Sequence, residues 1–186
     1  MVVSIRPRRS LLYMPGSNAR AIAKGRSLVA DGLILDLEDS VTPDNKEAAR
    51  RAVCDWVEEA DFGAKECLVR INPQDSPWGR DDVEEIAGAH PDGLVLPKVN
   101  SRASVDAVDR VVSSIEERNN VQPGATSLVL IGTELPEAVF CLADMAGNGR
   151  VDGLTWGAEE KGRASPHLRR SAPRSIGRLA SRACRR

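Results

Sequence analysis

The sequence contains few residues that could form disulfides or a zinc site. Its 186 residues include four cysteines and two histidines. The cysteines lie far apart without any CxxC spacing, so neither a zinc site nor a disulfide framework is supported. We interpret them as reduced thiols that pack as small apolar side chains. They are Cys54, Cys67, Cys141 and Cys184.

Long hydrophobic runs are absent as well. No stretch approaches the roughly 20 apolar residues that cross a bilayer, and the basic N-terminus MVVSIRPRRS precedes only a short apolar run. We therefore expect no membrane partner and a cytoplasmic location. With 41% hydrophobic and 28% charged residues, the composition is that of an ordinary soluble domain with enough apolar material for a core.

Acidic residues are missing from the C-terminal segment, residues 161–186. This segment holds nine of the 26 Lys and Arg residues and none of the 27 acidic residues, so residues 1–160 carry a formal charge of about −10. We divide the chain into a domain at 1–160 and a basic, irregular or weakly helical tail at 161–186. The tail lacks interleaved aromatic residues, so we do not favour a nucleic-acid partner.

Short apolar runs recur along residues 1–160. Continuous runs of four to eight apolar residues are typical of strands buried on both faces of a parallel sheet. The runs alternate with segments that predict helices, at a spacing close to the roughly 31 residues per unit of a (β/α)8 TIM barrel. The sequence therefore predicts an α/β fold with about six of the eight units of such a barrel. The expected strands begin near residues 11, 33, 67, 93, 127 and 152.

An open, doubly wound sheet would show the same alternation of strands and helices. The first turn from strand to helix reads MPGSNAR and lacks the GxGxxG of a dinucleotide fold, which argues against that alternative.

A charged residue follows several of the runs at an even spacing. Residues two apart share a face of a strand, so Arg70, Lys98, Glu134 and Glu160 share a face with leucines of their own runs. If those leucines fill a barrel, the four charged side chains lie at its mouth, where such enzymes have their active sites. A strand-end salt bridge or a solvated position is the alternative for each. The leucines are Leu68, Leu94, Leu96, Leu128, Leu130 and Leu154.

Two carboxylates and two cations at one mouth suit a metal-assisted reaction. Mg²⁺ takes oxygen ligands, often one or two carboxylates together with substrate and water, so Glu134 and Glu160 are candidate ligands. Arg70 can hold a carboxylate or carbonyl oxygen in two places and stabilise a developing enolate. Lys98 is a further candidate for catalysis.

The second run ends in LDLEDS, with three acids in four residues. Burying Asp36, Glu38 and Asp39 together would be costly unless cations or a metal pair with them. Glu38 and Asp39 are therefore candidates for catalysis, and holding Arg70 or a lysine in place is the alternative role.

Six segments, in this order and spacing, resemble the citrate lyase beta subunit-like proteins of the HpcH/HpaI aldolase and citrate lyase superfamily. They are RSLLYMPGSN, LILDLEDSVTPDNKEAAR, LVRINP, GLVLPKV, TELPEAVF and GLTWGAEE, and they cover about residues 8–160. The resemblance implies a Mg²⁺-dependent (β/α) barrel lyase for acyl-coenzyme A thioesters. Such an enzyme cleaves or forms a carbon–carbon bond beside the thioester carbonyl, with a small 2-keto acid as the other substrate or product.

The resemblance also implies roles for single residues. The substrate-binding arginine of the family falls on Arg70, and the first metal ligand falls on Glu134. The second ligand is usually Asp in a GAED-like segment followed by Leu, whereas this chain has Glu160 followed by Lys161. A Glu can bind Mg²⁺, but its extra methylene displaces the carboxylate in a site that tolerates little misplacement.

Three further basic residues come from the N-terminal third. The resemblance places the segment from Arg9 to Pro15 and the loop after the second strand near the coenzyme A. Arg9 is therefore a candidate for substrate binding, and Lys24 is another. Lys24 and Lys46 fall on predicted helices, and a solvated helix face is the alternative for both.

Beyond residue 160 the resemblance ends, where the family continues with two more strands and C-terminal helices. The switch to Arg, Ser, Ala and Pro favours translation in a shifted reading frame as a hypothesis. Missing barrel units leave open sheet edges, so we expect homo-oligomers. Two alternatives to a CoA-ester lyase stay open: a metal-dependent aldolase for free 2-keto acids, and a catalytically inactive truncated product.

Overall fold

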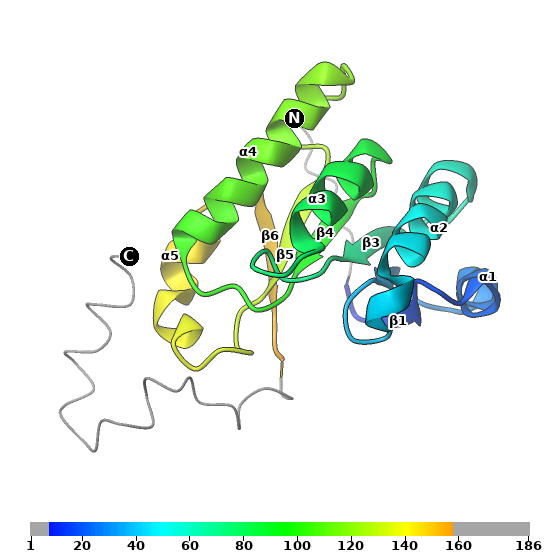
Figure 1. Cartoon of the computed structure of the whole chain (residues 1–186), viewed down its shortest axis with the longest axis horizontal. Coiled ribbons are helices and arrows are strands. Elements are labelled where there is room, and N and C mark those ends of the chain that lie inside the picture. Colours follow the sequence, from blue (N-terminus) through cyan, green and yellow to red (C-terminus); the bar gives the residue numbers. More distant parts are fainter. Residues whose placement is uncertain (1–7, 158–186) are drawn as a thin grey trace.

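Six parallel strands alternate with helices in a computed structural model that describes residues 8–157 (Figure 1). The strands follow one another in the sheet in chain order, and every neighbouring pair is parallel. The predicted α/β fold with six units is confirmed. Glu160 and the predicted tail at 161–186 lie outside the described residues. The strands are β1 (Leu11–Pro15), β2 (Gly32–Asp36), β3 (Glu66–Arg70), β4 (Gly93–Leu96), β5 (Ser127–Ile131) and β6 (Val151–Thr155).

Helices connect the strands and cover one face of the sheet, with α2, α3 and α4 packed next to one another (Figure 1). Among residues 8–157, no helix is long and apolar enough to cross a membrane. The helices are α1 (Ala19–Ser27), α2 (Lys46–Glu59), α3 (Gly79–Gly88), α4 (Arg102–Arg118) and α5 (Leu142–Ala146), and two short 3-10 helices are η1 (Pro43–Asn45) and η2 (Ala138–Cys141).

Local sequence determines where several helices begin. The Asn18 side chain accepts a hydrogen bond from the amide of Ala21, and Ser101 accepts one from the amide of Ser104, so both residues cap their helices. The sequence Thr42-Pro43 starts η1, and α2 begins only at Lys46.

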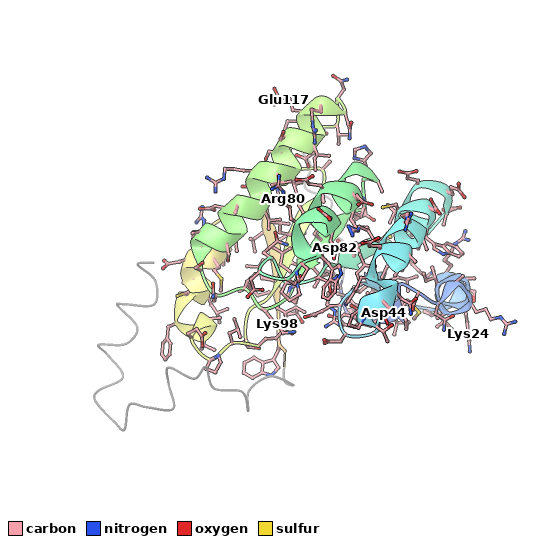
Figure 2. All side chains as sticks on the ribbon, viewed as in Figure 1. Lys24, Asp44, Arg80, Asp82, Lys98 and Glu117 are labelled. Carbon is pink, nitrogen blue, oxygen red and sulfur yellow. The ribbon has the colours of Figure 1, made fainter. Side chains whose placement is uncertain are left out.

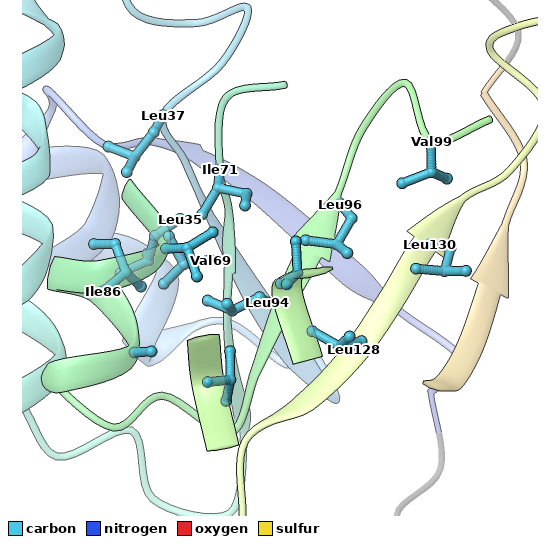
Figure 3. Packing of buried hydrophobic residues seen from close by; sticks show 14 of the residues in the cluster. Leu35, Leu37, Val69, Ile71, Ile86, Leu94, Leu96, Val99, Leu128 and Leu130 are labelled. Atoms are coloured by element: carbon cyan, nitrogen blue, oxygen red, sulfur yellow. The ribbon is translucent and has the colours of Figure 1, made fainter. Parts of the chain in front are cut away.

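The two faces of the sheet pack differently. The larger apolar cluster lies between strands and helices, with strand leucines packed near Ile86 of α3 (Figure 3). It also contains Val53 of α2 and Val105 of α4. Its strand residues include Leu35, Val69, Leu94, Leu96, Leu128 and Leu130. A smaller cluster on the other face contains Ile34, Leu68, Val95, Val129 and Ile131 and involves no helix. The second face is therefore the inside of the curved sheet.

The predicted assignment of leucines to the inside is wrong for two strands. Leu94 and Leu96 of β4, and both leucines of β5, face the helices, while only Leu68 lies in the inner cluster. A parallel sheet buries both faces, so an unbroken apolar run carries no signal for which residues point inward.

Arginines before β1 tie together the amino ends of the strands. Arg8 pairs with Glu66 of β3, with its Nη2 2.6 Å from Oε1. The same Nη2 lies 2.6 Å from Oδ2 of Asp152 in β6. Arg9 forms a separate pair with Asp31, which also accepts hydrogen bonds from the backbone amides of Arg9 and Ser10.

Asp31→Asn is expected to destabilise the protein at neutral pH but not in acid. The hydrogen bond from the Arg9 side chain, helped by two backbone amides, lowers the pKa of Asp31 from 3.8 to about 2. A carboxylate with a depressed folded-state pKa stabilises the protein above its unfolded pKa, and this contribution is lost as the pH falls toward the folded value. Urea unfolding should therefore show a difference at pH 7 that shrinks below pH 3.8. Asp75→Asn, at an exposed loop position, is the control and should leave the free energy of unfolding at pH 7 unchanged.

Candidate functional site

The carboxyl ends of the strands border a cleft of about 540 Å³ on the inner face of the sheet. Its walls come from β1, from β2 and the loop after it, from β3, from β5 and the loop after it, and from the segment after β6. Because these strands are parallel, side chains distant in sequence meet at this end. The lining residues are Tyr13, Asp36, Asp39, Ser40, Arg70, Ile131, Glu134, Trp156 and Gly157.

Arg70 is surrounded by carboxylates. It forms two parallel hydrogen bonds with Asp36, its register partner on β2, at 2.7 Å from Nε and 2.8 Å from Nη2. Its Nη1 lies 3.1 Å from Glu38 and 3.4 Å from Asp39. The guanidinium carbon also lies 4.9 Å from the centre of the Tyr13 ring, within range of a cation–π interaction. These contacts hold the guanidinium in one orientation.

The pair of Arg70 and Asp36 stays charged although it is buried. Burial alone would lower the pKa of Arg70, but the hydrogen bonds and charge of Asp36 outweigh it and raise that pKa. Burial would raise the pKa of Asp36, and the hydrogen bonds from Arg70 and Ser40 lower it below its usual value instead. The Arg70 guanidinium therefore keeps its positive charge within the cleft.

Glu38 links Arg70 to Lys98. Nζ of Lys98 lies 2.5 Å from Oε1 of Glu38, whose other oxygen faces Arg70. Burial raises the pKa of Glu38, although both cations act to lower it. Burial acts to lower the pKa of Lys98, but the hydrogen bond and charge of Glu38 raise it. The lysine is therefore held as a cation at the side of the cleft.

Glu134 reaches the cleft from the loop after β5. Its Oε2 accepts a 2.6 Å hydrogen bond from the backbone amide of Lys98. Lys98 has φ 51°, a left-handed conformation that is uncommon outside glycine and that costs free energy. Burial raises the pKa of Glu134 despite this hydrogen bond. The charged form of this carboxylate is thus poorly compensated by its surroundings.

The surroundings of Glu134 fit a divalent cation. Within residues 8–157, only Oε2 accepts a hydrogen bond, so Oε1 remains for a ligand in the cleft. The same residues contain no group of three or more His, Cys, Asp or Glu side chains that could hold a metal. A hard cation such as Mg²⁺ needs only one or two protein carboxylates, with substrate and water completing its shell. Glu134 would be one ligand, and Glu160 lies outside the described residues.

The structure brings together five of the predicted site residues, namely Glu38, Asp39, Arg70, Lys98 and Glu134. It does not bring Arg9 or Lys24 to them. Arg9 lies at the amino end of the sheet and is 79% exposed. Lys24 is exposed on α1, well apart from Lys98 (Figure 2).

Sequence reasoning missed three contributors to this region. Tyr13 lies two residues from Leu11 on β1 and so shares its inner face, but the sequence carries no signal for which face is inner. Lys46 is 6% exposed, so the solvated helix face considered for it is wrong. Gly157 gave no signal, since its role depends on a close approach in three dimensions.

Gly157 packs directly against Glu134. A Cβ atom at this position would lie 2.5 Å from Cγ of Glu134 and 2.8 Å from Cγ2 of Ile131. The Thr133 hydroxyl accepts a hydrogen bond from the Gly157 amide and donates one to its carbonyl, at 2.9 Å and 3.1 Å. The backbone is therefore held where only glycine leaves room for the carboxylate.

Gly157→Ala is expected to displace Glu134 and to lower the free energy of unfolding by about 1 to 3 kcal/mol, the usual cost of overpacking. Mg²⁺ affinity should fall together with stability. Urea unfolding and calorimetric Mg²⁺ titration measure the two effects. Gly149→Ala is the control, since a Cβ there would meet nothing within 4 Å. Unchanged Mg²⁺ affinity in a folded Gly157→Ala variant would contradict a role for this contact.

Comparison with known proteins gives consistent matches. Residues 9–169 match the family model described as HpcH/HpaI aldolase/citrate lyase. The chain is 36% identical over 154 residues to a (3S)-malyl-CoA thioesterase of Cereibacter sphaeroides. This match covers 83% of this chain and 50% of that protein. It is 34% identical over 156 residues to citrate lyase subunit beta of Escherichia coli, covering 83% and 51%.

A solved structure shares the fold. The CitE protein of Mycobacterium tuberculosis in complex with magnesium and acetoacetate aligns with a TM-score of 0.64 at 27% identity, over 96% of this chain and 69% of that one. The six-stranded sheet is thus consistent with a partial TIM barrel like the citrate lyase beta structures. The chain spans about half the length of the curated relatives it matches. By its sequence and its fold, the chain belongs to the HpcH/HpaI aldolase/citrate lyase family.

Proposed function

We propose that this chain acts as a Mg²⁺-dependent carbon–carbon lyase on 3-hydroxyacyl-CoA esters of the citryl-CoA or malyl-CoA type. The products of cleavage would be an acyl-CoA and a small 2-keto acid. One observation carries the proposal: the same cleft is lined by the Arg70 guanidinium, which Asp36 holds, and by Glu134, a buried carboxylate with one oxygen left for a cation. The names of relatives that act on malyl-CoA and citrate support the choice of substrate class.

Arg70 has one N–H donor left for a substrate. Its guanidinium carries five N–H groups, of which Asp36 accepts two and Glu38 and Asp39 face others. A carboxylate or keto oxygen in the cleft can take the remaining N–H, and the positive charge then stabilises the negative charge that develops on oxygen. In cleavage, the bond between the hydroxyl-bearing carbon and the carbon beside the thioester carbonyl breaks. The hydroxyl oxygen loses its proton and becomes the keto oxygen, and the acyl-CoA carbon keeps the electron pair of the broken bond and gains a proton.

Glu134 would hold the metal, which supplies polarisation of the keto-acid carbonyl when bound. The backbone amide of Lys98 orients the Glu134 carboxylate, and the Lys98 side chain adds positive charge near Glu38. Tyr13 and Trp156 add aromatic surface to the lining of the cleft.

Turnover of malyl-CoA, citryl-CoA and citramalyl-CoA by the purified chain with Mg²⁺ tests the proposal. Formation of acyl-CoA and keto acid that stops in EDTA supports it. A folded chain without turnover of any of these esters would instead favour an inactive product. Affinity for free 2-keto acids without affinity for coenzyme A, measured by calorimetry, would favour the aldolase alternative.

Thioester hydrolysis is a second candidate, favoured by the 36% identity to a malyl-CoA thioesterase. Hydrolysis releases the free thiol of coenzyme A, whereas carbon–carbon cleavage leaves the thioester intact. A thiol reagent added to the malyl-CoA assay therefore separates the two reactions in the same sample.

A further inference from the structure

A buried lysine lies directly behind the acidic loop of the cleft. Lys46 is the first residue of α2, and its Nζ donates to the carbonyl oxygens of Leu37 and Glu38 at 2.7 Å and 2.6 Å. Its third hydrogen bond, at 2.7 Å, goes to Oδ1 of Asn72. A protonated lysine has three N–H donors, so this ammonium is fully used. The Trp78 ring lies 5.4 Å from Nζ.

Buried polar groups hold the third acceptor in place. Oδ2 of Asp82 accepts hydrogen bonds from both the backbone amide and the side-chain amide of Asn72, at 2.8 Å and 2.6 Å. Nε of Arg50 lies 3.3 Å from the other oxygen of Asp82. Because the Asn72 nitrogen is committed to Asp82, its oxygen must face Lys46. Arg50 of α2, Asp82 of α3 and Asn72 thus form one polar network that supports Lys46; Asp82 is labelled in Figure 2.

Lys46 and Asp36 both form hydrogen bonds with the peptide unit that joins Leu37 to Glu38. The carbonyl of Leu37 accepts from Lys46, and the amide of Glu38 in the same planar unit donates to Oδ1 of Asp36 at 2.9 Å. The amide of Ser40 donates to the other oxygen of Asp36 at 3.1 Å. With both of its polar groups held, this peptide unit has one orientation.

That orientation decides where the Glu38 carboxylate points. The Glu38 side chain starts at the Cα atom that follows the Leu37–Glu38 peptide, and its two carboxylate oxygens lie against Lys98 and Arg70. One peptide unit therefore sets the geometry between the two cations of the cleft.

We propose that Lys46 is a positioning residue, which fixes the Leu37–Glu38 peptide so that Glu38 joins Lys98 to Arg70 in a geometry suited to a keto acid. The proposal rests on the proposed function for its substrate class. Lys46 touches no substrate, and it acts only through Glu38.

Lys46→Met keeps most of the side-chain volume and removes the ammonium. We expect amide hydrogen exchange at Glu38 and Ser40 to accelerate at least about tenfold, because the loop loses its anchor, while amides of β5 keep their protection. Lys65→Met is the matched control, a lysine before β3 at the amino end of the sheet. Lys46→Gln, which retains two N–H donors, is the milder second variant and should give an intermediate acceleration.

Binding of pyruvate in the presence of Mg²⁺ gives the functional readout. Lys46→Met should weaken the affinity for pyruvate by about 10- to 100-fold. Losses of this size are typical when a residue that orients the ligands of a metal site is removed. In a Glu38→Gln background the same change should have little further effect, since the two residues act as one unit. A merely structural lysine would weaken binding equally in both backgrounds.

The hydrogen-exchange and pyruvate-binding experiments test separate claims. If the wild-type chain does not bind pyruvate with Mg²⁺, the proposed function fails and hydrogen exchange still tests the peptide anchor. Unchanged exchange at Glu38 and Ser40 in both Lys46 variants would overturn the proposal, as would an equal loss of pyruvate affinity with and without Glu38→Gln.

Discussion

Arg70→Ala is expected to lower the free energy of unfolding by about 3 to 5 kcal/mol, the usual cost of removing one partner of a buried ion pair. The Asp36 and Glu38 side chains are 3% and 5% exposed, so neither can turn to water when the guanidinium is gone. Loss of the central cation should also abolish binding of pyruvate with Mg²⁺. Urea unfolding followed by circular dichroism measures the stability, and calorimetry measures the binding.

Two further variants separate charge from geometry. Arg70→Lys keeps the positive charge but loses the paired hydrogen bonds to Asp36, so it should lie between wild type and Arg70→Ala in both measurements. Adding Asp36→Asn to Arg70→Ala removes an unpaired negative charge and should restore part of the stability without restoring binding. Wild-type stability in the single Arg70→Ala variant would show that the carboxylates do not depend on this cation.

Glu134→Gln should lower Mg²⁺-dependent turnover on the order of 10²-fold or more, since a metal ligand supports several kcal/mol of charge stabilisation during reaction. Stability should stay equal or rise. Burial raises the pKa of Glu134, which means that the folded state disfavours its charged form, and this cost is present at pH 7 and relieved as the pH falls. A neutral amide removes the cost and can still accept from the Lys98 amide.

Turnover and urea unfolding should therefore move in opposite directions for Glu134→Gln, as at sites where function costs stability. Glu59→Gln, at an exposed position near the end of α2, is the control and should leave both unchanged. A Glu134→Gln variant that loses stability and keeps its Mg²⁺ affinity would argue for a structural carboxylate.

The order and spacing of strands were predictable because each βα unit leaves its own local pattern, an apolar run followed by a helical stripe. Parallel strands end together, so Arg70 and Glu134 could be predicted to lie at one end of the sheet. The prediction from shared strand faces was right only for Arg70, because Leu128 and Leu130 in the strand before Glu134 face the helices. Lys98 lies in the site, but not because it shares a strand face with Leu94 and Leu96 as predicted. Its strand ends at Leu96, and a left-handed backbone two residues later directs its contacts, so alternation along the strand no longer applied.

Features that depend on packing between elements were not predictable. Lys46 reads as one more charged residue on a helix, and its burial depends on Asn72 and on two carbonyl groups of another loop. Which leucines point inward was likewise undetermined, because leucine suits both faces of a covered sheet equally. Gly157 has no Cβ atom, and this absence leaves room for the Glu134 side chain. The sequence pattern does not indicate that these two residues are in contact.

The contacts of Arg8 have a consequence for association between molecules. In the described part of the chain, β1 and β6 are the edge strands, and exposed edges are templates for pairing with other chains. Arg8 precedes β1 yet reaches Asp152 of β6, so the curl of the sheet turns its two edges toward each other at the amino end. A strand from another chain that pairs with one of these edges at the amino end would therefore lie close to the other edge as well.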